Sequence, residues 1–179
     1  MVIVGVDEAG RGPLAGSVYA AAVILDNSKK IEGLNDSKKL SPKKREALYS
    51  EIKEKAIFGI AFATSEEVDK INILNATFLA MKRAIEQIKI KFDYVYVDGN
   101  IYPFKDFKGE ALVKGDSKIE EIMAASILAK VERDNYMLNM DKLYPEYQFF
   151  KHKGYPTKLH KELINKYGLS PIHRKSFKI

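Results

Sequence analysis

The chain has 179 residues, 46% of them hydrophobic, and a formal net charge of +6. This length and composition predict one domain with a substantial core. The absence of cysteine excludes a disulfide framework and a thiolate metal site, so a bound metal would need oxygen or imidazole ligands. No apolar run is long enough to cross a bilayer, and no basic and apolar leader opens the chain. We therefore expect a cytoplasmic protein without membrane contact, whose charge is compatible with a polyanionic partner.

The first apolar run, residues 2–6, is rich in β-branched side chains and predicts a buried strand that ends at Asp7 and Glu8. An ionised carboxylate at the end of a buried strand is costly unless a cation meets it, and a divalent metal ion is the usual partner. Glycines at 10 and 12 then leave room for a ligand to approach the backbone, with Arg11 between them. The alternative is a plain strand end, since acidic residues and glycine also favour turns.

The next elements predict a sheet with helices on it. Residues 17–25 form a second apolar run, close enough to pair antiparallel with the first, and residues 56–63 predict a third strand that is central or well covered. Between these strands, Ser41 and Pro42 begin a helix that runs to about Lys55. Its inner face is predicted to carry Ala47, Leu48 and Ile52.

A second helical region begins at a capping box formed by Thr64 and Glu67. Farther along, over residues 74–88, apolar residues recur at intervals of three and four and mark one helix face: Phe78, Met81, Ile85 and Ile88.

Residues 93–98 repeat the pattern of the opening strand, because an apolar and aromatic run again ends in a carboxylate, Asp98, followed by glycine. If a helical crossover makes the two strands parallel, Asp98 and Asp7 emerge side by side at the carboxyl edge of the sheet, where ligands bind in open α/β sheets. An Asp-Gly-Asn turn without function is the alternative.

Asp116 follows a short predicted fifth strand, residues 111–115. Ser117 and Glu120 form a capping box for the next helix, so Asp116 is not needed to begin that helix. The helix is predicted over residues 118–140, with one face that carries Ile119, Ile122, Met123, Ser126, Ile127 and Lys130.

Aromatic and basic residues are interleaved in the C-terminal region, in residues 149–157 first and then at His160, Lys161, Lys166, Tyr167, His173, Arg174 and Lys175. Such a mixture suits a nucleic-acid backbone, because cations meet phosphates and flat rings stack on sugars or bases. A solvated basic helix is the alternative. The histidines are too scattered along the sequence to predict a metal site.

Residues 4–16 resemble the opening signature of ribonuclease HII, the type 2 ribonuclease H family. Further similar blocks lie at residues 36–40, 114–116, 124–134, 154–157 and 172–177. The resemblance implies an α/β, ribonuclease H-like fold, with a mixed five-stranded sheet whose first three strands are antiparallel. Residues 1–145 would form the catalytic part and residues 146–179 a basic helical region packed on the same domain. The chain ends shortly after Phe177, where many relatives continue into a longer helical tail.

The resemblance also implies a site. Asp7, Glu8, Asp98 and Asp116 would be the catalytic carboxylates and would hold one or two Mg²⁺ or Mn²⁺ ions, while Asp134 would be structural. The substrate would be bound by Gly10, Arg11, Gly12, Lys38 and Tyr155.

The implied activity is metal-dependent hydrolysis of RNA in RNA/DNA hybrids, and cleavage 5′ to a single ribonucleotide in duplex DNA, with 3′-hydroxyl and 5′-phosphate ends. Such an enzyme would serve DNA replication and ribonucleotide excision repair. We expect a monomer, and a contact with a replication clamp is left open.

Two other functions fit parts of the sequence. A resolvase or transposase-like nuclease of the same fold would use the same carboxylates, but the Gly-Arg-Gly turn and the C-terminal tyrosine argue against it. A non-catalytic hybrid-binding module has no need for clustered acids, which repel phosphate unless a metal intervenes. A small-molecule phosphatase fits the basic aromatic region poorly.

Overall fold

The computed structural model describes all 179 residues, and its centre is a five-stranded mixed sheet in the order β3-β2-β1-β4-β5. The strands are β1 (Ile3–Ala9), β2 (Val18–Ile24), β3 (Ile57–Ala63), β4 (Tyr94–Asp98) and β5 (Gly109–Leu112). The first three pair antiparallel, whereas β4 lies parallel to both β1 and β5. The predicted fold class and strand directions are confirmed.

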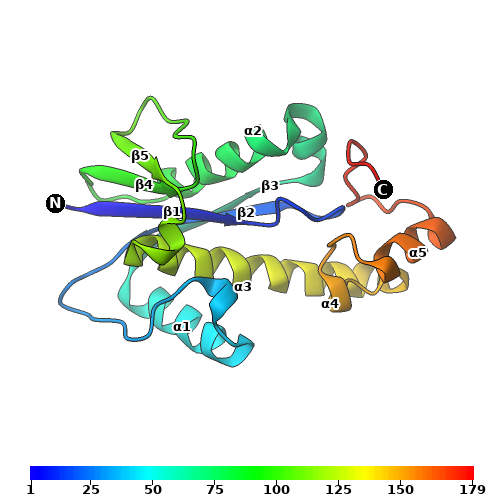
Figure 1. Cartoon of the computed structure of the whole chain (residues 1–179), viewed down its shortest axis with the longest axis horizontal. Coiled ribbons are helices and arrows are strands. Elements are labelled where there is room, and N and C mark those ends of the chain that lie inside the picture. The colour runs from blue at the N-terminus through cyan, green and yellow to red at the C-terminus, as the bar shows by residue number, and fades with distance from the viewer.

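Helices cover both faces of the sheet, with α2 on one side and α1 and α3 on the other (Figure 1). The helices are α1 (Pro42–Lys55), α2 (Ser65–Glu86), α3 (Glu120–Leu143), α4 (Phe149–His152) and α5 (Lys158–Tyr167), and short 3₁₀ turns lie at Ser37–Lys39, Gly115–Ser117 and Pro145–Tyr147. The last two helices lie beyond the end of the sheet with the C-terminus. None of the helices combines the length and the apolar character that a membrane span requires.

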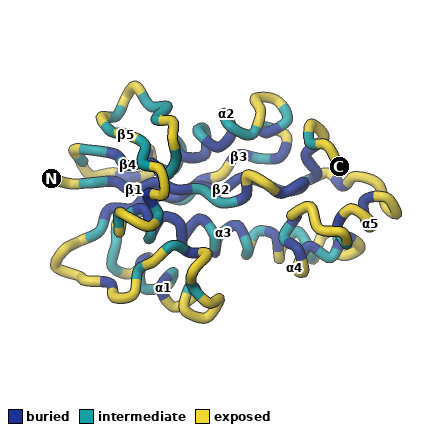
Figure 2. Tube along the Cα trace, in the orientation of Figure 1, coloured by how far each residue is buried: buried dark blue, intermediate teal, exposed yellow.

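Successive residues of β1 face opposite sides of the sheet. Figure 2 shows this strand in the buried centre of the molecule. Val4 and Val6 pack in the cluster on the α2 side. Gly5 and Asp7 therefore face α3. The period of two thus places the first carboxylate on the α3 side of the sheet.

Gly5 allows α3 to approach β1 closely. A Cβ atom at this position would lie 2.3 Å from the backbone carbon of Glu121 and 2.4 Å from the backbone nitrogen of Ile122. We expect Gly5→Ala to lower the free energy of unfolding by about 3 kcal/mol, because backbone atoms cannot move aside as a flexible side chain can. Urea unfolding measures this loss. Gly12→Ala is the control, since its Cβ would lie 3.8 Å from the Tyr155 ring; equal stability of the two variants would contradict close packing at Gly5.

The prediction that the third strand is central or well covered is wrong, because β3 is an edge strand. Ile57 and Phe62 are exposed on it. The outer backbone groups of β3 bond to side chains at the end of α2. The side-chain amide of Gln87, the residue that follows α2, pairs with both the N–H and the C=O of Ile60. Arg83 likewise donates to the Phe62 carbonyl. Side-chain pairing of this kind protects the edge and cannot be recognised from an apolar run.

Three smaller details also differ from the predictions. On α1, Ala47 is exposed, although Leu48 and Ile52 are buried as predicted. The fifth strand begins and ends earlier than predicted. The capping box at Ser117 is absent, because Ser117 ends a 3₁₀ turn and α3 begins at Glu120 with no side-chain cap. The capping box of Thr64 and Glu67 is confirmed.

Candidate active site

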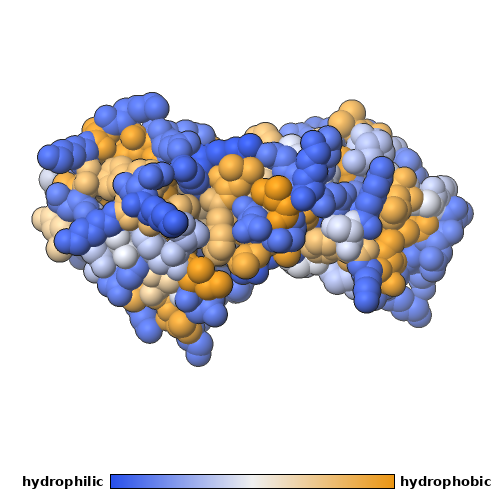
Figure 3. Space-filling view, turned by 90° about the horizontal axis from the view of Figure 1, so that it is seen from above, coloured by the Kyte–Doolittle hydropathy of each residue, from blue (hydrophilic) through white to orange (hydrophobic).

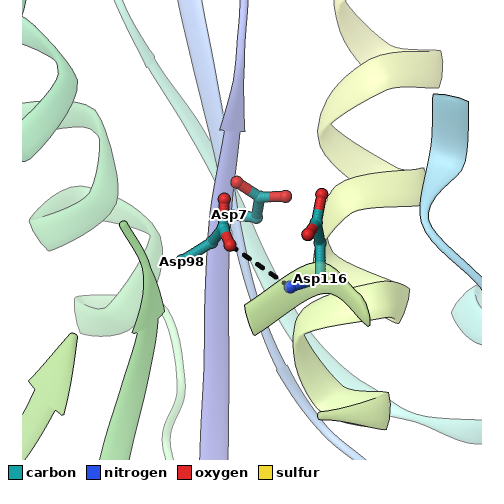
Figure 4. A group of neighbouring side chains, drawn as sticks. All are labelled: Asp7, Asp98 and Asp116. Atoms are coloured by element: carbon teal, nitrogen blue, oxygen red, sulfur yellow. Dashed lines mark hydrogen bonds between the residues drawn. The ribbon is translucent and has the colours of Figure 1, made fainter. Parts of the chain in front are cut away.

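Three aspartates meet at the carboxyl edge of β1 and β4 (Figure 4). The parallel register pairs Val6 with Val97, so Asp7 and Asp98 follow side by side, as the sequence predicted. Asp116 reaches the same point from the 3₁₀ turn before α3. One carboxylate oxygen from each lies within 4.8 Å of the others, which is a spacing that can hold a metal ion.

Backbone N–H groups orient two of these carboxylates. Asp7 Oδ1 accepts the N–H of Glu8 at 2.8 Å, and Asp98 Oδ1 accepts the N–H of Asp116 at 3.2 Å. The second bond ties the end of β4 to the turn that carries the third aspartate. The cluster is therefore set by the sheet register and by this turn.

The site accumulates negative charge without a paired cation. Asp7 is 6% exposed. Burial raises its pKa well above the ordinary value, and the carboxylates of Glu8 and Asp98 raise it further. Burial also raises the pKa of Asp116, with smaller contributions from Asp98 and Asp36. None of the ion pairs in the structure includes these carboxylates, and a divalent cation could balance their charge.

Most residues predicted for the site line one cavity of about 250 Å³: Asp7, Glu8, Gly10, Arg11, Lys38, Asp98, Asp116 and Tyr155. Glu8 belongs to the cavity but not to the group of three close aspartates. Gly12 does not line it, although a Cβ there would touch the Tyr155 ring. The structure thus brings the predicted turn, carboxylates and tyrosine together.

Ser126 and Lys130 also line the cavity, although the sequence analysis predicted for them only a place on a helix face. The hydroxyl of Ser126 accepts the backbone N–H of Ser37 at 3.2 Å, which fixes the segment carrying Lys38 against α3. Lys130 bonds to Asp134 at 3.0 Å. The helical spacing of four between positions 126 and 130 was the signal that could have placed both at the site.

The C-terminal region differs from its predicted basic surface in one respect. His160, His173 and Arg174 are buried, so they cannot meet phosphates. Lys151, Lys161, Lys166 and Lys175 are exposed as expected, and so is Tyr167. Sequence patterns did not separate the two groups because both lie among basic residues.

The three histidines gather in one buried cluster, although they are scattered along the sequence. The rings of His152 and His160 stack with centroids 4.2 Å apart, and Nε2 of His160 lies 2.9 Å from Nε2 of His173. Every ring nitrogen has a partner: the remaining ones bond to the backbone at Tyr147, Gly154, Tyr155 and Ser170 and to the Ser170 hydroxyl. The cluster is a structural network with no nitrogen free for a metal ion.

The histidine network should make stability depend on pH. Burial lowers the pKa of His160 and of His173 from 6.5 to about 4. Between these values the unfolded chain binds more protons than the folded one, so stability falls as pH drops from about 6.5 to 4. At pH 5 we therefore expect these two histidines to take up about two protons from the solvent when the chain unfolds. The pH dependence of urea unfolding tests this, and a slope unchanged by His160→Gln would contradict it.

Comparison with known proteins places this geometry in a family. The sequence model that describes the ribonuclease HII family matches residues 4–179 of this chain. The chain belongs to the ribonuclease HII family. Ribonuclease HII of Alteromonas mediterranea is 59% identical over 99% of this chain and 94% of its own length. Ribonuclease H2 of Pyrococcus horikoshii OT3 superposes with a TM-score of 0.81 and 31% identity, covering 99% of this chain and 94% of that one.

A further ribonuclease HII, from Archaeoglobus fulgidus, was solved in a complex with PCNA. It has a TM-score of 0.81 and 23% identity, over 100% of this chain and 96% of that one, and at this identity it shows the fold alone. Membership of the ribonuclease HII family makes the chain a metal-dependent endoribonuclease of the ribonuclease H type that acts on RNA/DNA hybrids. The family and enzyme class predicted from the sequence are confirmed.

Proposed function

We propose that the chain also cuts duplex DNA on the 5′ side of a single embedded ribonucleotide, and that all its products carry 3′-hydroxyl and 5′-phosphate ends. The observation that carries this proposal is the aspartate cluster, which shares one cavity with the Gly10–Arg11 turn and Tyr155. A general nuclease would need the carboxylates alone. Groups that can recognise a ribose, placed beside the carboxylates, favour a ribonucleotide-specific enzyme.

Asp7, Glu8, Asp98 and Asp116 would hold two Mg²⁺ or Mn²⁺ ions. The donors fit such ions because they are carboxylate oxygens only and have no ion-pair partner, and because the three aspartates lie close together while Glu8 lines the same cavity. When bound, the two ions supply an activated water and stabilisation of the leaving oxygen. The N–H groups of Glu8 and Asp116 hold the carboxylates of Asp7 and Asp98 in place, so little reorganisation precedes binding.

The residues around the aspartates would orient the substrate. The turn at Gly10, Arg11 and Gly12 would contact the ribose 2′-hydroxyl, and Tyr155 would stack on the neighbouring sugar. Lys38 is exposed, lines the same cavity and would meet a phosphate. Binding the sugar and the phosphate beside the carboxylates would place the scissile bond at the metal site.

The C-terminal region would extend the duplex-binding surface. Figure 3 shows hydrophilic and hydrophobic side chains interleaved over the end of the molecule formed by this region. Residues 146–179 would act as one domain with residues 1–145, because hydrogen bonds join Leu14 to Gly154 and Gly16 to Ile172 across the two parts. We further propose a cytoplasmic monomer that serves replication and ribonucleotide excision repair.

Four lysines of the C-terminal region are expected to contact phosphates: Lys151, Lys153, Lys161 and Lys166. Changing one to Met should weaken duplex binding and flatten its salt dependence by roughly one counterion, because each lysine neutralises one phosphate. The cleavage rate at saturating substrate should barely change. Binding measured across a salt series checks this, and an unchanged slope in all four variants would mean that the region is a solvated surface.

A cleavage assay on three duplexes of one sequence tests the proposed function. The duplexes are an RNA/DNA hybrid, DNA with one ribonucleotide, and all-DNA. With Mg²⁺ the first two should be cut and the third left intact, and chelation of the metal should stop both reactions. Cutting of all-DNA would support the resolvase-like alternative, and binding without cutting would support the non-catalytic module.

A further inference from the structure

Two arginines, Arg133 of α3 and Arg174 near the C-terminus, are buried without a carboxylate partner. Each is 1% exposed. None of the ion pairs in the structure includes either of them. A buried guanidinium is costly unless its donors are all satisfied, and here backbone carbonyl oxygens satisfy them. The sequence alone gave no reason to separate these arginines from surface bases.

Arg174 binds the segment that follows β1. Its Nε donates to the Gly16 carbonyl at 2.9 Å, and Nη1 donates to the carbonyls of Pro13 at 2.8 Å and Arg11 at 3.0 Å. Its Nη2 donates to the Gly10 carbonyl at 2.6 Å. One side chain therefore holds four carbonyls of a short loop.

Arg133 continues the same arrangement. It donates to the carbonyls of Ser17 at 3.0 Å, Ala15 at 3.0 Å and Lys153 at 2.9 Å. Its guanidinium also lies 5.6 Å from the centre of the Tyr155 ring. The two arginines thus turn the loop's carbonyls inward and join the loop to the segment that carries the tyrosine.

The loop's exposed N–H groups are left free by this arrangement. Arg11 and Gly12 are exposed, and their backbone N–H groups bond to no acceptor within the protein. Two neighbouring backbone N–H groups form a site for an oxygen acceptor when the carbonyls around them in the loop are bound on the other side. This site lies next to the aspartate cluster, because Arg11 lines the same cavity.

We propose that Arg174 is a positioning residue for ribonucleotide recognition: it holds the carbonyls of Gly10, Arg11, Pro13 and Gly16 inward so that the N–H groups of Arg11 and Gly12 face the substrate. This inference rests on the proposed function and names the residue that shapes its recognition loop. Lysine cannot replace Arg174, because an ammonium group has three donors and lacks the planar fork that spans four carbonyls.

Binding without metal isolates this role from catalysis. The affinities of wild type and Arg174→Lys are measured in EDTA for a duplex with one ribonucleotide and for all-DNA of the same sequence. We expect the preference for the ribonucleotide to fall about tenfold, or to vanish, at unchanged affinity for all-DNA. A smaller fraction of folded protein would lower both affinities equally, so it would leave the ratio of the two affinities unchanged. Lys178→Met, which removes an exposed charge near Arg174, should keep the wild-type ratio.

An undiminished preference in Arg174→Lys overturns the inference and leaves the proposed function standing. A wild type without any preference overturns both. If Arg174→Lys does not fold, ¹⁵N-arginine spectra of the wild type replace it: the Nε–H signal of Arg174 should shift with the ribonucleotide duplex and not with all-DNA. Arg83, which pairs with Glu67, is the control whose signal should not move. Equal shifts of Arg174 with both duplexes would contradict the inference.

Discussion

Asp7→Asn should lower cleavage of the hybrid and of the single-ribonucleotide duplex by about a thousandfold or more, because it removes one of the charges that would hold the metal ions. The protein should stay folded. Without metal its melting temperature should equal or exceed that of the wild type, since the substitution relieves a buried charge that Glu8 and Asp98 repel. Cleavage kinetics and melting curves with and without Mn²⁺ measure these effects.

The same variant should lose the rise in melting temperature that Mn²⁺ gives the wild type, because binding to the folded state alone stabilises it. Asp106→Asn is the matched control, as Asp106 is an exposed aspartate that pairs with Lys82 away from the cavity. It should keep both cleavage and the Mn²⁺ effect. Near wild-type cleavage by a folded Asp7→Asn or Asp98→Asn protein would overturn the proposed metal site.

Tyr155→Ala should lower cleavage at a single ribonucleotide by about ten- to a hundredfold, the range expected when one stacking ring is lost. Stability should change little, because the ring is 36% exposed and the backbone of this residue is held by other groups. Its N–H donates to the His152 carbonyl and its carbonyl accepts from Thr157 and His160, none of which the substitution removes. Rate measurements at saturating substrate and melting curves test both parts.

Tyr155→Phe is the matched variant, since it keeps the ring and removes only the hydroxyl. It should retain most of the activity if the ring stacks on the sugar. A Tyr155→Ala protein whose losses in rate and in stability are similar would identify the ring as ordinary packing, and full activity in Tyr155→Ala would remove it from the site.

The sequence predicted the carboxylates because strand ends are visible in it. Asp7 and Asp98 each end an apolar run, and the parallel pairing of those runs follows from the helix between them. Asp116 was recognised for a reason that the structure changes, since the capping box after it does not form. The register and the turn, not the cap, bring it to the cluster.

The buried cations and rings could not be predicted in the same way. Arg174 and His173 stand among exposed basic residues, and their burial depends on contacts with segments far away in the sequence, such as the loop that contains Pro13. The edge position of β3 was also hidden, because Gln87 satisfies its backbone from a distant element. Periodicity reports which face of an element is apolar, but it does not report which partner covers that face.

Mapping the cut in a duplex that contains one ribonucleotide tests the central claim most directly. The strand is labelled at its 5′ end, incubated with the wild type and Mg²⁺, and its product is compared with size markers and offered to a DNA polymerase. We predict one product that ends at the deoxynucleotide before the ribonucleotide and carries a 3′-hydroxyl that the polymerase extends. A cut on the 3′ side of the ribonucleotide, a product that cannot be extended, or equal cleavage without divalent metal would contradict the account.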